Sequence, residues 1–169
     1  MKQVIQNFKT GELYVDDVPL PSLSEGMVLI ENRFSLISAG TERGTVKVAQ
    51  ANLLNKARQR PDLVAQVIQN IKKEGLKATI SKVRAKLDSL KALGYSTSGV
   101  VITSMDTNGL FKTGDRVACA GVDYASHAEI VAVPQNLVVK IPDEVSFADA
   151  SFTTLGAIAM QGVRQAEVR

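Results

Sequence analysis

Between residues 93 and 141 the chain reads LGYSTSGVVITSMDTNGLFKTGDRVACAGVDYASHAEIVAVPQNLVVKI, in which short apolar runs alternate with turn residues. Glycine and proline separate the runs, and Thr107-Asn108-Gly109 is a turn signal. Strands at roughly ten-residue spacing are typical of an antiparallel barrel or sandwich. The predicted strands are Ser98–Ile102, Asp115–Ala120, His127–Val133 and Leu137–Ile141.

Residues 1–34 have the same strand character. Val4 and Ile5 open a short apolar segment, a turn follows at Phe8-Lys9-Thr10-Gly11, and Glu12–Val15 returns. Gly26–Phe34 is a further predicted strand. We therefore expect a mainly β domain in which residues 1–44 and 93–141 form one partly open antiparallel barrel.

Residues 46–90 follow a helical period instead. Apolar residues recur at i, i+4 and i+7 from Val64 and at i, i+3 and i+7 from Ile80. Pro61 suits a first helical turn, and Gly75 suits a helix end. The pattern predicts three amphipathic helices near 46–59, 61–74 and 76–90. They would form a helical insert at about 45–92 within a single domain of residues 1–169.

A last helix is expected over residues 147–165. Ser146 is a candidate N-cap, with Asp149 three residues further on.

Composition excludes several classes of protein. The chain has 169 residues, and because 45% of them are hydrophobic it is not a disordered tail. It is not a disulfide scaffold either, because Cys119 is its one cysteine. No apolar run approaches the roughly 18–20 residues of a membrane span, and the N-terminus turns polar within six residues. These features predict a cytoplasmic protein without a membrane span.

The net charge of +3 is unevenly distributed. Residues 43–91 contain 12 basic and 3 acidic side chains, whereas the rest of the chain contains 8 basic and 14 acidic ones. The basic helices could be a solvated face, a lid over a cofactor or an anionic substrate, or a docking surface for the acidic body of another subunit. No aromatic residue lies between Arg43 and Leu93, which disfavours nucleic acid as the partner.

Several motifs occur in a recognisable order. GDRVA stands at 114–118, AEIVAVPQNLVVKIPD at 128–143, and an apolar helix closes the chain; near the start, the strand VLIENRFSLIS at 28–38 leads into GTER at 40–43. This order resembles the N-terminal, GroES-like half of the medium-chain dehydrogenase/reductases, the alcohol dehydrogenase and quinone reductase superfamily, over residues 1–44 and 93–169. The insert with KARQRPD at 56–62 is similar to a subgroup in which a nucleotide domain follows, often with a further oxidoreductase domain of the glucose-fructose oxidoreductase type.

The resemblance implies the substrate-side domain of an NAD(P)-dependent oxidoreductase. In the family a following Rossmann domain binds the cofactor, and that domain needs a G-x-G-x-x-G loop. No two of the 12 glycines of this chain stand two positions apart, so the motif is absent. We expect NAD or NADP only in a complete protein, with the small-molecule substrate in a cleft shared with the missing nucleotide domain. The isolated chain should bind no cofactor and should be inactive.

The resemblance also implies that zinc is absent. The ligand positions of the family's zinc enzymes fall at Ser38 (or Ala39 with a one-residue shift), at Gly94-Tyr95-Ser96 and at Thr154. Zinc in proteins is bound by cysteine, histidine or carboxylate side chains, and none stands at these positions. A four-cysteine structural zinc lobe is excluded, since Cys119 is alone.

Hydroxyl groups at positions that would line the family's cleft are the candidate catalytic residues. They could donate to a substrate carbonyl as hydride arrives, Tyr95 could also act as a general acid, and Thr154 could contact the cofactor. Alternatively, the Ser and Thr hydroxyls bond local backbone, and Tyr95 is a packing residue. The candidates are Ser38, Thr41, Tyr95, Ser96 and Thr154.

Four further residues have structural interpretations beside functional ones. Glu42 and Arg43 could anchor a ligand, or pair locally and cap a helix. His127, the one histidine, is interpreted as a surface or satisfied residue, and Cys119 as a small buried apolar residue.

A second function from another class stays open: a noncatalytic GroES-like module for assembly or partner docking through the basic helices. In either case we expect a homo-oligomer that uses residues 147–165 or the amphipathic insert as its contact.

Overall fold

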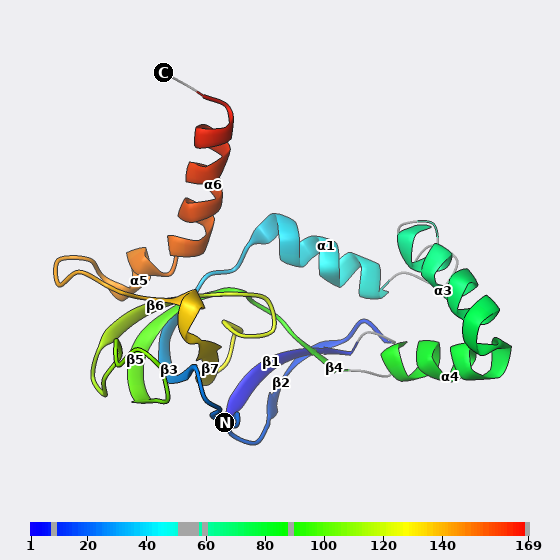
Figure 1. Ribbon diagram of the computed structural model, residues 1–169, viewed down its shortest axis with the longest axis horizontal. Coiled ribbons are helices and arrows are strands. Elements are labelled where there is room, and N and C mark those ends of the chain that lie inside the picture. Colours follow the sequence, from blue (N-terminus) through cyan, green and yellow to red (C-terminus); the bar gives the residue numbers. More distant parts are fainter. Residues whose placement is uncertain (8–9, 51–57, 59–60, 88–89, 168–169) are drawn as a thin grey trace. The chain divides into compact units, whose positions relative to one another are not determined.

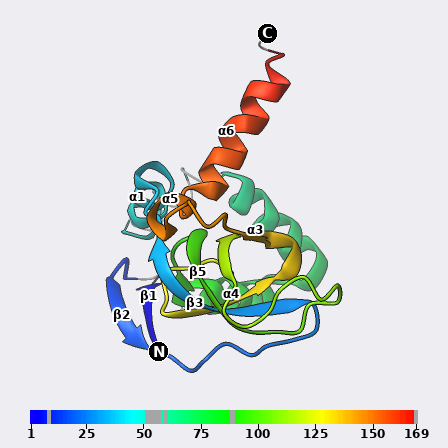
Figure 2. The same ribbon diagram turned by 90° about the vertical axis from the view of Figure 1, so that its left-hand side faces the viewer.

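The computed structural model describes residues 1–7, 10–50, 58, 61–87 and 90–167. These residues group into two compact units, and Figures 1 and 2 label the helices and strands of both. The barrel unit comprises Met1–Val4, Val15–Ile37 and the chain from Ala92 onward, and the helical unit comprises Ile5–Tyr14 and Ser38–Lys91. Each unit is described below by itself.

A curled five-stranded antiparallel sheet forms the barrel unit (Figure 2). Its order is β7-β3-β5-β6-β8, which confirms the mainly β, antiparallel architecture expected from the sequence, although residues 2–7 and 13–17, expected in the same barrel, form part of a separate sheet. Small and β-branched residues on its inner face, such as Val28, Ile30 and Val117, are completely buried. The strands are β3 (Met27–Ser35), β5 (Ser96–Ser104), β6 (Arg116–Ala120), β7 (Ile130–Pro134) and β8 (Val138–Lys140), with a 3-10 turn η1 (Gln135–Leu137) before the last.

Strands β3 and β5 approach each other unusually closely. Their register shifts between Leu29 and Ile30 and again between Asn32 and Phe34, as at a β-bulge. A Cβ atom on Gly99 would lie 2.1 Å from the carbonyl oxygen of Glu31. Gly99 is therefore required by the close backbone approach.

Helices α5 (Phe147–Ala150) and α6 (Thr153–Gln165) close the barrel unit. Ser146 is the N-cap of α5, since its side chain accepts a hydrogen bond from the Asp149 amide, as predicted. The prediction of one helix over 147–165 is wrong, because the helix breaks at residues 151–152. There, the hydroxyls of Ser151 and Thr153 donate to the carbonyls of Ala148 and Ala150 and compete with regular helical bonding.

A three-stranded sheet of order β2-β1-β4 contains β1 (Lys2–Asn7), β2 (Leu13–Asp17) and β4 (Leu90–Ala92). The hairpin of β1 and β2 was predicted, but β4 was not: the sequence pattern placed the helix end at 90 and the insert end at 92. Leu90 continues the apolar helical period, so the pattern could not separate it from the helix. Strand pairing with β1 overrides that local pattern, and just beyond β4 the Leu93 amide donates to the Val4 carbonyl (3.3 Å).

The helical unit contains α1 (Ala39–Gln50), α3 (Pro61–Glu74) and α4 (Leu76–Leu87). The predicted stop at Gly75 is confirmed, with a φ of +85° that suits glycine, and α3 and α4 pack together on either side of it. The first helix begins at Ala39, seven residues before the predicted start, so the GTER segment at 40–43 lies inside it. Most of the predicted 51–59 part lies outside the described residues. None of the described helices has the length and apolar character that a bilayer span requires.

The close approach of β3 and β5 generates the first prediction. Gly99→Ala should destabilise the chain by at least about 1–3 kcal/mol, because the new methyl group meets backbone that cannot move without breaking the sheet. Gly162→Ala on α6 is the matched control: its Cβ meets nothing within 4 Å, and alanine favours a helix by about 0.5–1 kcal/mol. Urea unfolding of both variants measures the difference. Equal free energies of unfolding for the two variants would contradict the close backbone approach at Gly99.

Candidate functional site

Three of the five candidate residues lie at one end of the barrel unit. Ser96 begins β5 and pairs with Ala120 at the end of β6, and the carbonyl of Tyr95 accepts a hydrogen bond from Gly121 just beyond that strand (2.9 Å). Thr154 lies in the first turn of α6, and its Oγ1 donates to the carbonyl of Cys119 (3.4 Å). Tyr95, Ser96 and Thr154 thus surround the end of β6.

Ser96 has a structural bond in this cluster. The side chain is buried, and its Oγ donates to the carbonyl of Ser151 (2.6 Å). Ser98, two residues on and therefore on the same face of the strand, donates to the carbonyl of Phe147 (2.5 Å). The two serines hold α5 against the sheet, so we interpret Ser96 as a positioning residue. Sequence reasoning did not select Ser98.

Thr154 lines a largely apolar groove of about 500 Å³. One wall is α6 and the other is β6 with η1 and β8. The hydroxyl of Thr154 is half-buried at this groove, and Tyr95 is also half-buried. The groove offers an apolar surface with few polar groups, the composition expected of a pocket that orients a small organic molecule.

Ser38 and Thr41 lie in the helical unit at the start of α1. Ser38 Oγ donates to Thr41 Oγ1 (3.2 Å), and the Ser38 amide donates to Glu42 Oε1 (2.9 Å). Glu42 therefore caps this helix, which supports its structural interpretation. Thr41 and Arg43 are exposed.

Metal-binding groups do not converge among the residues that the structure describes: no three His, Cys, Asp or Glu side chains are grouped there. Cys119 is buried, and that burial raises the pKa of its thiol to about 12. The side chain is thus a neutral thiol at physiological pH, neither a nucleophile nor a ready metal ligand. This agrees with the sequence interpretation of a small buried residue.

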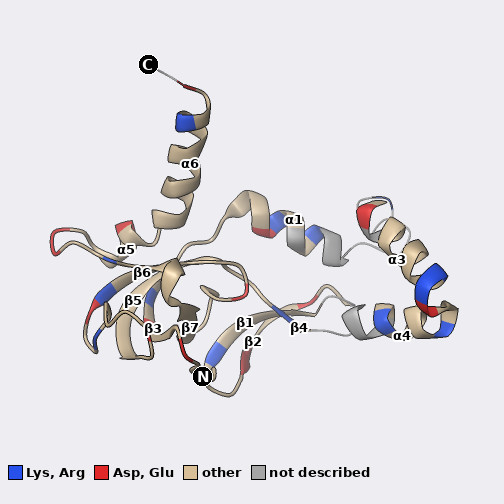
Figure 3. Cartoon of the chain, viewed as in Figure 1, with Lys and Arg blue, Asp and Glu red and all other residues tan. Residues whose placement is uncertain are grey.

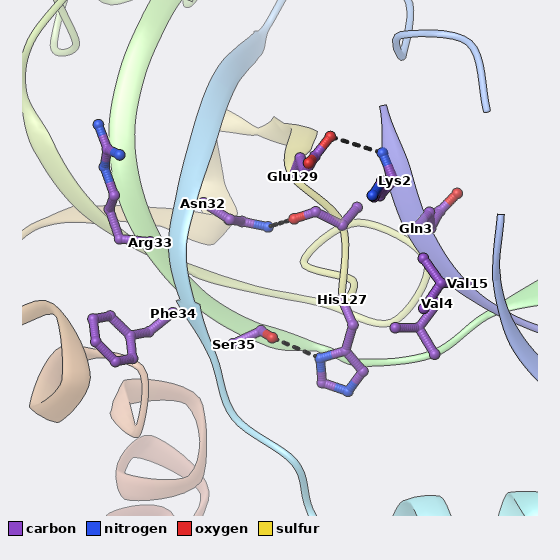
Figure 4. Close-up of a pocket in the computed structure, with 11 residues that line it drawn as sticks. Lys2, Gln3, Val4, Val15, Asn32, Arg33, Phe34, Ser35, His127 and Glu129 are labelled. Atoms are coloured by element: carbon purple, nitrogen blue, oxygen red, sulfur yellow. Dashed lines mark hydrogen bonds between the residues drawn. The ribbon is translucent and has the colours of Figure 1, made fainter. Parts of the chain in front are cut away.

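A second cavity, of about 310 Å³, lies on the barrel unit between β1, β3 and the segment 127–129 (Figure 4). His127 Nδ1 is 2.9 Å from Ser35 Oγ, and the two residues are 92 positions apart in the sequence. Val4 and Val15 give the cavity an apolar wall, and Glu129 accepts a hydrogen bond from the backbone amide of Lys2 (2.8 Å). No sequence signal connected Ser35 with His127, because only tertiary folding brings them together.

The backbone of His127 is held on both sides. The His127 amide donates to the carbonyl of Leu93 (2.7 Å), and the His127 carbonyl accepts a hydrogen bond from the amide of Val4 (2.8 Å). A Cβ atom on Gly94 would lie 2.8 Å from the backbone nitrogen of His127 and 2.9 Å from its ring nitrogen Nδ1, and φ at Gly94 is +97°. Only glycine at position 94 accommodates the ring in this place.

Comparison with solved structures identifies the fold. The whole chain superposes on 46% of the quinone oxidoreductase of Coxiella burnetii with a TM-score of 0.66 and 20% identity. It also superposes on 42% of the quinone oxidoreductase of Thermus thermophilus, solved in complex with NADPH, with a TM-score of 0.60 and 20% identity. The chain therefore has the GroES-like fold of the matched part of these quinone oxidoreductases.

Curated proteins match a shorter part of this GroES-like chain. It is 41% identical over 58 residues to the human synaptic vesicle membrane protein VAT-1 homolog-like, which is 34% of this chain and 14% of that protein. No family model matches the sequence. The chain therefore spans less than half of the solved structures named above and about one seventh of this curated relative.

The contact between Gly94 and the imidazole generates a prediction for this GroES-like domain. Because His127 is the one histidine, its ring gives unambiguous nitrogen signals in NMR spectra. Gly94→Ala should shift the Nδ1 signal as strongly as Ser35→Ala, since the methyl group displaces the ring from Ser35. Gly109→Ala is the matched control, with φ at +62° but nothing within 4 Å. Wild-type imidazole signals in a folded Gly94→Ala protein would refute the contact.

The buried thiol generates another prediction. With a pKa of about 12, on the order of one thiol in 10⁴ is ionised at pH 8, so alkylation of Cys119 should be about 10³-fold slower in the native chain than in denaturant. Mass spectrometry after iodoacetamide treatment measures both rates on the single cysteine. Similar rates with and without denaturant would show that the thiol is accessible.

Proposed function

We propose that this GroES-like domain is the substrate-side part of an NAD(P)-dependent oxidoreductase that uses hydroxyl groups in place of zinc. The observation that carries the proposal is the chemistry at the positions that the family resemblance assigns to metal ligands. Ser38, Tyr95 and Thr154 are hydroxyl residues, Thr154 lines the apolar groove, and the backbone of Tyr95 is bonded to Gly121 just beyond β6. The likeness to quinone oxidoreductases supports the same class of reaction.

The sequence lacks the G-x-G-x-x-G loop that binds the pyrophosphate of a dinucleotide, so the residues of this chain do not match a Rossmann-type NAD(P) site. In the proposal a nucleotide-binding domain outside these residues holds NAD(P), which supplies the hydride. This chain holds the substrate carbonyl or quinone and delivers a proton to its oxygen.

The described hydroxyls suit that task in different ways. Thr154 is half-buried at the groove, and in the proposal its hydroxyl exchanges the long bond to the Cys119 carbonyl (3.4 Å) for one to a substrate or cofactor oxygen. Tyr95 has a phenol that can both donate a hydrogen bond and transfer a proton. Within the helical unit, Ser38 directly before α1 and Thr41 on α1 are candidate donors; in the barrel unit, Ser96 acts through its hold on α5.

The test uses the complete polypeptide that joins this chain to a nucleotide-binding domain, assayed for NADPH oxidation with quinone and aldehyde substrates. Tyr95→Phe should lower kcat by about 10²-fold or more, the usual contribution of a general acid. Thr154→Val should lower kcat/KM. Tyr124→Phe, at an exposed tyrosine, is the matched control and should leave both constants unchanged.

Chelation separates this mechanism from the zinc-dependent one. Activity should survive prolonged dialysis against EDTA, because the proposed donors need no metal. Activity that is lost on chelation and restored by zinc would reject the proposal, as would unchanged kinetics in both the Tyr95 and the Thr154 variants. The 169-residue chain alone should give no calorimetric signal with NADPH.

A further inference from the structure

Helices α3 and α4 of the helical unit carry a concentrated positive charge. Together with the turn between them they span residues 61–87, which we name the basic helix pair. This segment has 6 basic and 2 acidic residues and hence a net charge of +4, whereas the barrel unit, with 7 basic and 12 acidic residues within its bounds, has −5. Figure 3 shows Lys and Arg on both helices of the pair. The basic helix pair therefore attracts an anionic surface.

Each helix of the pair also exposes a row of aliphatic side chains. Val64 and Ile68 on α3 are 37% and 50% exposed, and Leu76 and Ile80 on α4 are 60% and 43% exposed. In both rows the two residues stand four positions apart, so they lie on one face of their helix. The packing of α3 against α4 thus leaves apolar surface in water on each helix.

Lysine residues border both aliphatic rows. Lys72 stands four residues after Ile68 on α3, and Lys77 stands three residues before Ile80 on α4, so each lysine is a surface neighbour of an exposed isoleucine. Both lysines are exposed, and Glu74 beside them forms its ion pair with Lys82. An apolar row with a basic border is the pattern of a helix that lies in the interface of a membrane.

We propose that the basic helix pair binds the surface of a membrane that contains anionic lipid. The aliphatic rows enter the boundary between headgroups and acyl chains. The lysine ammonium groups reach the lipid phosphates and carboxylates, while their methylene stems cover apolar surface. The attraction between basic residues and anionic lipid falls off within a Debye length, so it is strongest for lysines that stand beside the inserted groups.

The composition of the pair favours a lipid surface over a protein or a nucleic acid. Four of its six basic residues are lysine, which is depleted at protein–protein interfaces, whose energetic anchors are mostly Trp, Tyr and Arg. The sequence has no aromatic residue between Arg43 and Leu93 on which a base could stack. A fluid lipid surface requires neither aromatic anchors nor a shaped partner, because aliphatic groups and long lysine side chains suffice there.

Co-sedimentation of the 169-residue chain with phospholipid vesicles tests the proposal. We expect binding to phosphatidylcholine vesicles that contain about 30% phosphatidylserine, measured at about 50 mM salt. The partition coefficient should fall by about tenfold or more at about 500 mM salt, because screening removes the attraction of the lysines. It should fall at least as far on vesicles of phosphatidylcholine alone.

Charge reversal at the border of the rows tests the lysines. Lys72→Glu/Lys77→Glu should lower the partition coefficient by at least about 25-fold, because each basic residue near an anionic surface contributes a factor of about five. Lys2→Glu/Lys112→Glu is the matched control, since it makes the same change in net charge at two exposed lysines of the barrel unit. The control should bind nearly as well as the wild type.

Substitution of the aliphatic groups tests insertion into the lipid. Ile68→Ser/Ile80→Ser should lower the partition coefficient by about tenfold or more without any change of charge, because two side chains lose their transfer out of water. Leu20→Ser/Leu110→Ser removes two exposed leucines of the barrel unit as the matched control and should leave binding unchanged. Circular dichroism checks that every variant is folded.

Three results would overturn the proposal. The first is no binding to phosphatidylserine vesicles at low salt, and the second is binding that survives substitution of either the lysines or the isoleucines of the basic helix pair. Binding lost only in the lysine variant would mean attraction to any acidic macromolecule, a protein included. The third is binding by the 169-residue chain that disappears in the complete polypeptide, which would mean that another part of the protein covers the pair. None of these outcomes depends on the proposed oxidoreductase activity.

Discussion

The barrel unit depends on a close backbone contact between β3 and β5 that is possible only because Gly99 has no side chain. Where β5 passes β3, the α-carbon of Gly99 faces the carbonyl of Glu31, and a methyl group would already collide with it. This contact lies in the interior of the five-stranded sheet, because β5 is its middle strand and β3 is the neighbour of β5. A register shift between Asn32 and Phe34 lies beside this contact, and at the end of the same strand Ser35 lies within hydrogen-bond distance of His127.

The candidate site is positioned by the same central strand. Ser96 and Ser98 of β5 donate to two carbonyls of the α5 segment, and Arg116 of β6 donates to the carbonyls of Pro142, Asp143 and Val145. The segment before α6 is thus held by side-chain donors that emerge from the sheet. Thr154 in the first turn of α6 takes its place at the end of β6 from this attachment.

Local signals in the sequence predicted the parts of this structure that depend on local chemistry. The Ser146 cap, the Gly75 stop and the short strands of the barrel all follow from residues within a few positions of each other. Strand β4 was missed because Leu90 fits a helical period and only pairing with β1 makes it a strand. The contact of Ser35 with His127 and the burial of Ser96 depend on residues tens of positions away, which periodicity does not detect.

In the proposed reaction hydroxyl groups take the place of a metal ion, so the protein must hold the hydroxyl groups themselves in fixed positions. A zinc ion carries its own charge, so it stabilises a developing alkoxide over a range of ligand arrangements. A hydroxyl is a neutral dipole whose hydrogen bond weakens steeply with misalignment, so its benefit depends on exact placement before the substrate binds. In the proposed reaction, the two serines that hold α5 therefore set the position of Thr154, although neither touches its hydroxyl. A substitution at Ser96 should affect the proposed reaction only by moving Thr154. We therefore count Ser96 among the residues that position the site and not among its hydrogen-bond donors.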